Sequence, residues 1–229
     1  MTTRKLYDEW SATYDAVVNP TRDLEKLACE SLLGQHSFGR VLELGGGTGK
    51  NTGWLAERAR ELVSVDLSPE MQAVARKKVP AANVEFRIGD VTSAWDFGHV
   101  FDLITCSLIL EHVEDLRHIF SEAARVVVPG GRFYVCELHP FKQYSGSKAR
   151  FESDEGLKVV ECFTHHLSDY TNAALISGFA IERIDEWFDG YDRSTVPRLV
   201  SFLFKRVQSS SSFLFILLCG LTFFHHRTG

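Results

Sequence analysis

The sequence lacks the patterns that mark several specialised classes of protein. Its five cysteines are odd in number and scattered, and none forms a C-x-x-C pair. This argues against a disulfide framework and favours a reduced, cytoplasmic protein. No cluster of His, Cys, Asp and Glu has the spacing of metal ligands, so we expect no metal. The net charge of −5 argues against a nucleic-acid partner.

The sequence also lacks an apolar run long enough to cross a membrane. The longest run, at 213–224, has twelve residues, whereas a spanning helix needs about 20. Because composition changes abruptly after a serine run, we expect 207–229 to lie outside the fold. Membrane contact by 213–224, a partner-binding strand and translated read-through are the alternatives, and the abrupt change favours read-through. The first residues show no apolar stretch typical of a secretory signal.

What the sequence does contain is an alternation of strand and helix patterns. Its 229 residues, 45% of them hydrophobic, are enough for one domain. The alternation predicts a doubly wound α/β fold with a mostly parallel sheet. Strand patterns lie at 40–44, 62–67, 84–88, 101–106, 132–138, 180–187 and 198–205, and helical patterns lie at 51–60, 68–78, 114–128 and 168–177.

Two further segments flank this alternation. Residues 1–37 have helical character, and we expect them to form an N-terminal cap. The polar segment 140–166 follows the fifth strand pattern, and we expect it to be a structureless lid or substrate wall. The last two strand patterns, 180–187 and 198–205, are expected to pair as an antiparallel hairpin.

The most informative segment is the glycine-rich run at 41–49, followed by an acid, Asp66, after the next apolar run. A dinucleotide fingerprint is excluded, because Lys50 stands where its third glycine should be. A Walker A loop is excluded as well, because Leu44 replaces its first glycine and Asn51 its serine or threonine. What remains is E-x-G-x-G-x-G with an acid at the next strand tip, which indicates an adenosine-containing ligand without a phosphate loop.

This spacing resembles the first motif of the class I S-adenosylmethionine-dependent methyltransferases. The segments 63–71, 89–91 and 101–113 and the Pro-Gly-Gly turn at 129–131 resemble further motifs of that family, in the family's order. The resemblance covers about residues 5–206 and implies a single Rossmann-like domain, 1–206, with a seven-stranded sheet and an antiparallel last strand. It implies S-adenosylmethionine as cofactor and S-adenosylhomocysteine as product.

The resemblance also implies which residues bind the cofactor. Asp66 would hold the ribose, Leu67 and Met71 would sandwich the adenine, and the third-strand tip would receive the adenine amino group. The backbone of Cys106 or Ser107, at the tip of the fourth strand, would lie beside the methionyl part of the cofactor. The segment 7–15 resembles the leading segment of the ubiquinone and menaquinone methyltransferases, whose tyrosines close over cofactor and substrate; here Tyr14 is the first choice and Tyr7 the second. The implied cofactor-binding set is Tyr14, Glu43, Gly45, Gly46, Gly47, Gly49, Asp66, Leu67, Met71, Asp90, Val91, Cys106 and Ser107.

Methyl transfer from a sulfonium demands alignment above all, and a base only where the acceptor must lose a proton. The candidate bases are Glu137, His139 and His165, with His139 first because it follows a strand tip. His112 is more typical of a packing or capping residue than of a catalyst. The acceptor is expected to be a small molecule, methylated at O, N or C, and the sequence does not indicate the oligomeric state.

The aromatic and cationic residues of 138–148 suit a planar, acidic acceptor. A non-catalytic nucleoside-binding module with the same fold is the alternative function. Aminopropyl transfer is disfavoured, because Cys106, Ser107 and Leu108 are uncharged where that reaction needs acids. Protein or nucleic-acid methylation is disfavoured by the absence of an N-P-P-Y-type segment.

Overall fold

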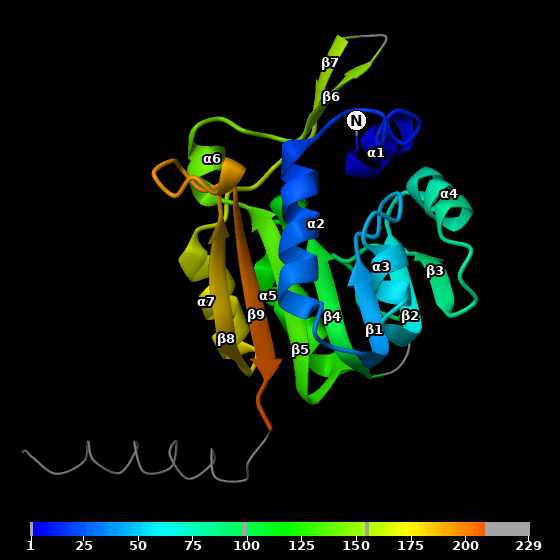
Figure 1. Ribbon diagram of the computed structural model, residues 1–229, viewed down its shortest axis with the longest axis vertical. Helices are drawn as coiled ribbons and strands as arrows, with labels where there is room; N and C mark the ends of the chain where they lie inside the picture. The colour runs from blue at the N-terminus through cyan, green and yellow to red at the C-terminus, as the bar shows by residue number, and fades with distance from the viewer. Residues whose placement is uncertain (1, 98–99, 154–155, 209–229) are drawn as a thin grey trace, which may run out of the picture.

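A computed structural model describes residues 2–97, 100–153 and 156–208 of the chain. Its seven-stranded sheet has the order β3-β2-β1-β4-β5-β9-β8 (Figure 1). All pairings among the strands β1 to β5 are parallel, and β9 is antiparallel to both of its neighbours. The predicted α/β sheet with an antiparallel last strand is therefore confirmed. The strands are β1 (Phe38–Leu44), β2 (Ala59–Asp66), β3 (Val84–Ile88), β4 (Phe101–Ser107), β5 (Val127–Leu138), β8 (Phe179–Trp187) and β9 (Leu199–Arg206).

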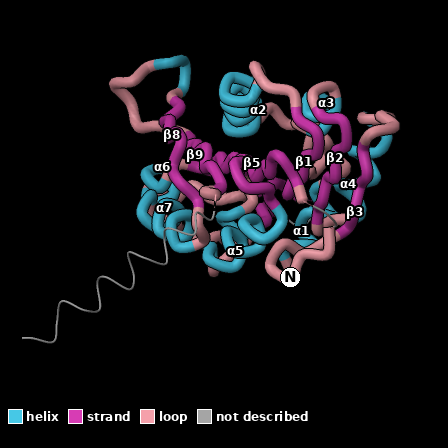
Figure 2. Tube along the Cα trace, turned by 90° about the horizontal axis from the view of Figure 1, so that it is seen from below, coloured by secondary structure: helices cyan, strands magenta, loops and turns pink. Residues whose placement is uncertain are grey.

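Helices cover both faces of the sheet (Figure 2). On one face, α2 (Pro20–Leu33) and α3 (Thr52–Ala56) pack on side chains such as Val41 and Leu103. On the other face, α5 (Leu116–Val126) and α7 (Leu167–Ile176) pack on the alternate residues of the same strands, such as Leu42. Since successive strand side chains point to opposite faces, each buried strand contributes to both cores.

Two helices lie near the carboxyl ends of the first strands. Helix α4 (Pro69–Lys78) begins at the tip of β2, and its N-cap Ser68 accepts a hydrogen bond from the Met71 N–H. Helix α1 (Thr3–Trp10) lies beside α4 (Figure 1), and the Ser68 hydroxyl donates to the Asp8 carboxylate at 2.6 Å. The N-terminal segment is therefore tied to the edge of the sheet where the ligand was expected.

The predicted helix at 51–60 is too long. Helix α3 ends at Ala56, and Ala59 already pairs with Phe38 of β1. The strand β2 thus begins three residues before the expected position 62 because its first residues find a neighbouring strand. Which strand pairs with which is decided by tertiary structure, and local helical propensity does not predict it.

The segment after β5 is not structureless, and that expectation is wrong. It forms α6 (Pro140–Tyr144) and a hairpin of β6 (Arg150–Ser153) and β7 (Gly156–Val159). His139 caps α6 by accepting from the Phe141 N–H at 3.2 Å. The Phe151 ring stacks on Trp10 of α1, with centroids 4.9 Å apart. An aromatic contact to the N-terminal helix therefore orders part of a polar segment.

Single-turn 3₁₀ helices follow β4 and β8, at Leu110–His112 and Asp189–Tyr191. The expected tail at 207–229 lies almost wholly outside the described residues, so its role stays a prediction, as do the domain limits. Within the described part of the chain, no helix is long and apolar enough to cross a bilayer.

Candidate active site

A cavity of about 540 Å³ opens at the carboxyl ends of β1 to β4, and we call it the large cavity. It lies where doubly wound sheets bind their ligands. Side chains of α1 and α2 complete its wall, among them Tyr7 and Glu25. The predicted cofactor-binding residues that line it are Tyr14, Glu43, Gly45, Gly46, Gly47, Asp66, Leu67, Met71, Asp90, Val91 and Ser107.

The glycine turn and Asp66 form one hydrogen-bonded unit. The Gly47 N–H donates to one oxygen of the Asp66 carboxylate at 2.8 Å, and the Ser68 N–H donates to the other at 2.8 Å. Burial raises the pKa of Asp66, while these two N–H groups act to lower it. A carboxylate oxygen accepts more than one hydrogen bond, so Asp66 retains acceptor capacity toward the cavity.

Gly46 allows the turn to approach the second strand. A Cβ at this position would collide with the Ser64 hydroxyl and would lie 3.1 Å from the Glu43 carboxylate. That carboxylate accepts from the Thr52 and Ser64 hydroxyls at 2.6 and 2.7 Å. Burial raises the pKa of Glu43 to about 7, so its proton occupancy changes close to neutral pH.

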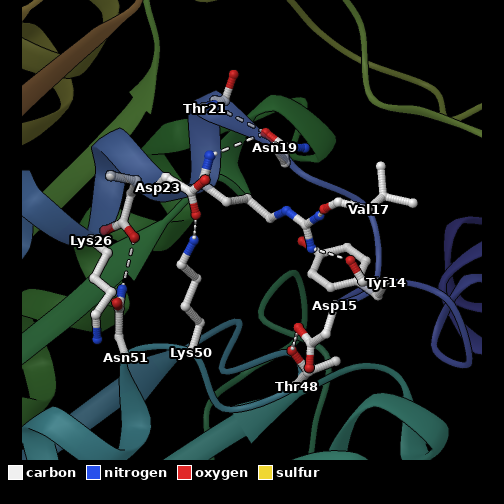
Figure 3. Close-up of polar contacts among 12 residues, drawn as sticks. Tyr14, Asp15, Val17, Asn19, Thr21, Asp23, Lys26, Thr48, Lys50 and Asn51 are labelled. Atoms are coloured by element: carbon white, nitrogen blue, oxygen red, sulfur yellow. Dashed lines mark hydrogen bonds and ion pairs between the residues drawn. The ribbon is translucent and has the colours of Figure 1, made fainter. Parts of the chain in front are cut away.

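The glycine turn is also joined to the N-terminal segment by side-chain contacts (Figure 3). The Lys50 ammonium donates to Asp23 at 2.6 Å, and the Thr48 hydroxyl donates to Asp15 at 2.8 Å. Lys50, which broke the dinucleotide fingerprint, is therefore a partner for an acid of α2. The segment 7–15, which resembles the leading segment of the quinone methyltransferases, is therefore hydrogen-bonded directly to the glycine-rich motif at 41–49.

Glu25 forms a further link across the floor of the large cavity. Its carboxylate accepts from the Asn51 amide at 2.8 Å and from the Ser107 hydroxyl at 2.6 Å. Burial raises the pKa of Glu25, although both hydrogen bonds act to lower it. Sequence reasoning missed Glu25 because it lies in an ordinary amphipathic helix with no motif around it.

Two predicted cofactor-binding residues are not among those lining the large cavity. Gly49 has a φ of +82°, and a Cβ there would lie 3.2 Å from the Ala75 side chain, so its place is the contact between the turn and α4. Cys106 is fully buried in the core beneath the fourth-strand tip. Their predicted binding roles stay untested, and the structure gives both a packing role.

The three predicted bases do not line the large cavity. Glu137 is buried and accepts from the backbone N–H groups of Ile109 and Leu110 at 3.1 and 3.0 Å. His139 caps α6 and lies 3.2 Å from Glu186. His165 lies within hydrogen-bond distance of the backbone oxygens of Leu110 and Val113.

The catalytic roles predicted for these residues stay untested, and their partners give each of them a structural role. Glu137 and His165 hold the backbone that follows β4, so they shape the wall of the large cavity from behind. Burial raises the pKa of Glu137 to about 8, and burial lowers the pKa of His139 although Glu186 opposes that shift. A perturbed pKa at a strand tip marks burial here and not exposure to a substrate.

His112, in contrast, lines the large cavity. Its Nδ1 lies 2.7 Å from the Glu161 carbonyl oxygen, which can only accept, so this nitrogen carries the proton. In the neutral imidazole Nε2 then has a lone pair, which accepts from the Tyr7 hydroxyl at 2.8 Å. Burial raises the pKa of Tyr7 well above its ordinary value, so the hydroxyl remains a donor at neutral pH.

A second cavity of about 280 Å³ adjoins the first, and we call it the small cavity. The two share Tyr7, Tyr14, Arg22 and Leu108 in their walls. The remaining wall comes from α1, the start of α2, the hairpin segment and the loop before β9. Its aromatic side chains are Tyr7, Trp10 and Tyr14, its cations are Arg22, Lys148, Arg150 and Arg198, and its acid is Glu111.

Glu111, His112 and Cys162 bring ligand atoms within 4.8 Å of one another between the two cavities. The sequence led us to expect no metal site, because these residues are distant along the chain. Both ring nitrogens of His112 already have hydrogen-bond partners, and burial raises the pKa of Cys162 to about 12. The cluster can hold a metal ion only by breaking one of these contacts, so we assign it no metal.

Comparisons with known proteins agree with this architecture. Residues 42–135 match the family described as "Methyltransferase domain". A demethylmenaquinone methyltransferase of Tropheryma whipplei is 32% identical over 146 residues, 60% of this chain and 59% of that protein. A ubiquinone biosynthesis O-methyltransferase of Xanthomonas oryzae is 28% identical over 143 residues, 61% of this chain and 59% of that protein. The chain thus spans less than two thirds of the length of these curated relatives.

A solved structure, the "DhpI-SAM-HEP complex", is 26% identical with a TM-score of 0.69, over 88% of this chain and 94% of that chain. The matched domain contains the glycine turn, Asp66 and the fourth-strand segment. Strand order, cavity position and relatives therefore agree with the motifs. In its motifs, its strand order and its relatives, the chain is similar to the class I S-adenosylmethionine-dependent methyltransferases.

Proposed function

We propose that the protein binds S-adenosylmethionine in the large cavity and transfers its methyl group to an O, N or C atom of a small molecule. The observation that carries this proposal is the single cavity that gathers the tips of four strands, each with a family motif. The cofactor supplies an activated methyl group on a sulfonium. The residues present fit such a group, because a Cβ at Gly47 would occupy otherwise open space at the large cavity and Asp66 keeps acceptor capacity.

In this proposal Asp66 accepts from the ribose hydroxyls, and Leu67 and Met71 flank the adenine. The acid at the third-strand tip, Asp90, accepts from the adenine amino group while its other partner is Thr92. The methionyl part lies along Ser107, near Glu25. Each of these residues lines the large cavity.

His112 is the best-placed base for an acceptor that loses a proton. Its Nε2 lies at the wall of the large cavity and accepts from the Tyr7 hydroxyl. A proton would therefore reach it through Tyr7, whose oxygen would take the acceptor's proton as the Tyr7 proton passes to Nε2. The Glu111 carboxylate lies 3.9 Å from this nitrogen and would stabilise the imidazolium after proton transfer. The Glu161 carbonyl keeps the ring in the tautomer that this step needs.

Calorimetry on the full chain tests the proposal. We expect S-adenosylmethionine and S-adenosylhomocysteine to bind at micromolar levels, and we expect turnover with a panel of small acceptors. Absence of binding for both would contradict it. Binding without turnover over a broad panel would favour the alternative, a non-catalytic module of the same fold. Residence in the cytoplasm and the absence of nucleic-acid and membrane partners remain parts of the proposal.

A further inference from the structure

The small cavity combines flat aromatic walls with an excess of positive charge. Trp10 and Tyr14 meet edge to face with centroids 4.8 Å apart, and Tyr7 lies 5.8 Å from Trp10. Four cations and one acid line the same space. Aromatic faces favour planar groups, and a cavity with one sign of charge attracts ligands of the opposite sign.

Arg22 is the cation that most needs a counter-charge. It is 8% exposed, and its guanidinium donates to the Tyr14 and Val17 carbonyls at 2.6 and 2.9 Å. Its Nε has no hydrogen-bond partner, and no carboxylate of the described residues forms an ion pair with it. A buried charge without a paired opposite charge is costly. The neighbouring Asp15 is already engaged by Lys78 and Thr48.

The other cations differ in their availability. Arg198 is ion-paired with Asp189 and donates to the Thr21 hydroxyl. Lys148 and Arg150 are exposed and line the small cavity, and within the described residues their side chains form no ion pair or hydrogen bond. Their charges are therefore free to act on a ligand.

We propose that the small cavity is the acceptor subsite and that it selects a planar small molecule bearing an anionic group such as a carboxylate. The inference rests on the proposed function, because the shared wall at Tyr7 and Arg22 connects this subsite to the large cavity. The planar part lies against the partly exposed rings of Tyr7 and Tyr14, because Trp10 is buried and stacked on Phe151. The anionic group faces the cluster of Arg22, Lys148 and Arg150.

The aromatic walls belong to the N-terminal segment and not to the residues on which an acidic planar acceptor was first suggested. Phe141 and Tyr144 are exposed on α6 and do not line either cavity described here. From that part of the chain, only Ser147 to Arg150 and Leu138 reach the small cavity. Of the aromatic and cationic residues expected there to bind an acceptor, only the cations line the small cavity.

The test compares matched ligands on the full chain saturated with S-adenosylhomocysteine. The probes are 3,4-dihydroxybenzoate and its carboxamide, which differ in charge and little in shape. We expect calorimetry to show the carboxylate binding at least about tenfold more tightly, with a preference that falls as salt rises. Equal affinities, a preference for the carboxamide, or no binding of either probe would overturn the inference.

Charge-reversal variants localise the effect. Lys148→Glu combined with Arg150→Glu should weaken carboxylate binding about tenfold and leave the carboxamide within about twofold. Lys77→Glu combined with Lys205→Glu changes the net charge equally at exposed positions away from both cavities, and it should leave both probes unchanged. Equal losses in the two double variants would overturn the inference, since the effect would then come from net charge.

The proposed function and this inference fail separately. If the unaltered protein does not bind S-adenosylhomocysteine, the proposed function is contradicted. The comparison of carboxylate with carboxamide on the ligand-free chain then still decides whether the small cavity selects anions.

Discussion

The two cavities share a wall, yet they are built in different ways. The large cavity is formed mainly by backbone turns that follow β1, β2, β3 and β4, and its motifs are each contiguous in the sequence. The small cavity is formed by residues of 7–22, of 108–111 after β4, of 138–150 and of the loop before β9. Local motifs therefore define a donor site, whereas an acceptor site depends on how distant segments meet.

If the large cavity depends on local motifs, one side chain at a strand tip should matter most. Asp66→Ala removes the acceptors offered to a ribose, and we expect S-adenosylhomocysteine binding to weaken by about 2–4 kcal/mol, roughly 30- to 1,000-fold. Calorimetry measures the affinity. The melting temperature of the ligand-free variant serves as control, because the Gly47 and Ser68 N–H groups also lose their partner. Unaltered affinity in a folded variant would contradict the assignment.

The region behind both cavities gives a pH-dependent test. Burial raises the folded-state pKa of Glu137 to about 8, so the folded state binds more protons than the unfolded state between about pH 4.5 and 8. The free energy of unfolding should therefore fall as pH rises through this window. One pKa unit corresponds to about 1.4 kcal/mol, so the decline should reach a few kcal/mol.

Glu137→Gln separates this structural role from the catalytic role first predicted for Glu137. The amide oxygen can still accept from the Ile109 and Leu110 N–H groups, so we expect turnover within a few-fold of the parent and a smaller decline of stability with pH. Denaturant unfolding from pH 5 to 9 measures the stability. Complete loss of turnover in a folded, cofactor-binding variant would restore Glu137 as a catalytic candidate.

A smaller effect should come from the backbone of the large cavity. Gly46→Ala places a methyl group against Ser64 and Glu43, and such overpacking costs about 1–3 kcal/mol. We expect reduced stability and reduced cofactor affinity. Gly53→Ala is the matched control, because its Cβ would meet only Val79, at 3.6 Å. If the two variants behaved alike, close approach at Gly46 would not explain the glycine.

At the wall shared by the cavities, Tyr7→Phe removes the hydroxyl that holds His112. The loss of one hydrogen bond corresponds to about 1 kcal/mol, roughly fivefold, and we expect it in kcat and not in cofactor affinity. Steady-state kinetics with any turned-over acceptor checks this split. A change confined to the S-adenosylmethionine KM would indicate that Tyr7 belongs to the donor site.

The smallest effect is expected at Lys50. Its ion pair with Asp23 is partly exposed, and such pairs are worth about 0–1 kcal/mol. Lys50→Ala should therefore change stability by less than about 1 kcal/mol and cofactor affinity by less than about threefold. Thermal melting and calorimetry test both values. A much larger loss of affinity would show that Lys50 contacts the cofactor directly.

Most of the fold was predictable because each strand and helix carries a local pattern. The misjudged boundaries have tertiary causes: Ala59 joins β2 because Phe38 lies beside it, and Phe151 becomes part of a strand that packs on Trp10. Gly49 and Cys106 carry motif positions but are used for packing. Arg22 and Glu25 could not be predicted as site residues, because they line the large cavity only through the packing of α2 on the sheet.

The sequence alone predicted the α/β fold and indicated the family, because the glycine turn and the acid at the next strand tip are local patterns that follow one another along the chain. The predicted α/β sheet is confirmed by the strand order, and the methyltransferase relatives agree with the family that the motifs indicate. Only the tertiary structure decided which side chains face the cavities. Glu137 and His165 contact backbone groups and His139 caps a helix. Tyr7, His112 and Arg22, in contrast, all line the large cavity. The contact between Tyr7 and His112 joins residues 105 positions apart, and no local pattern specifies it.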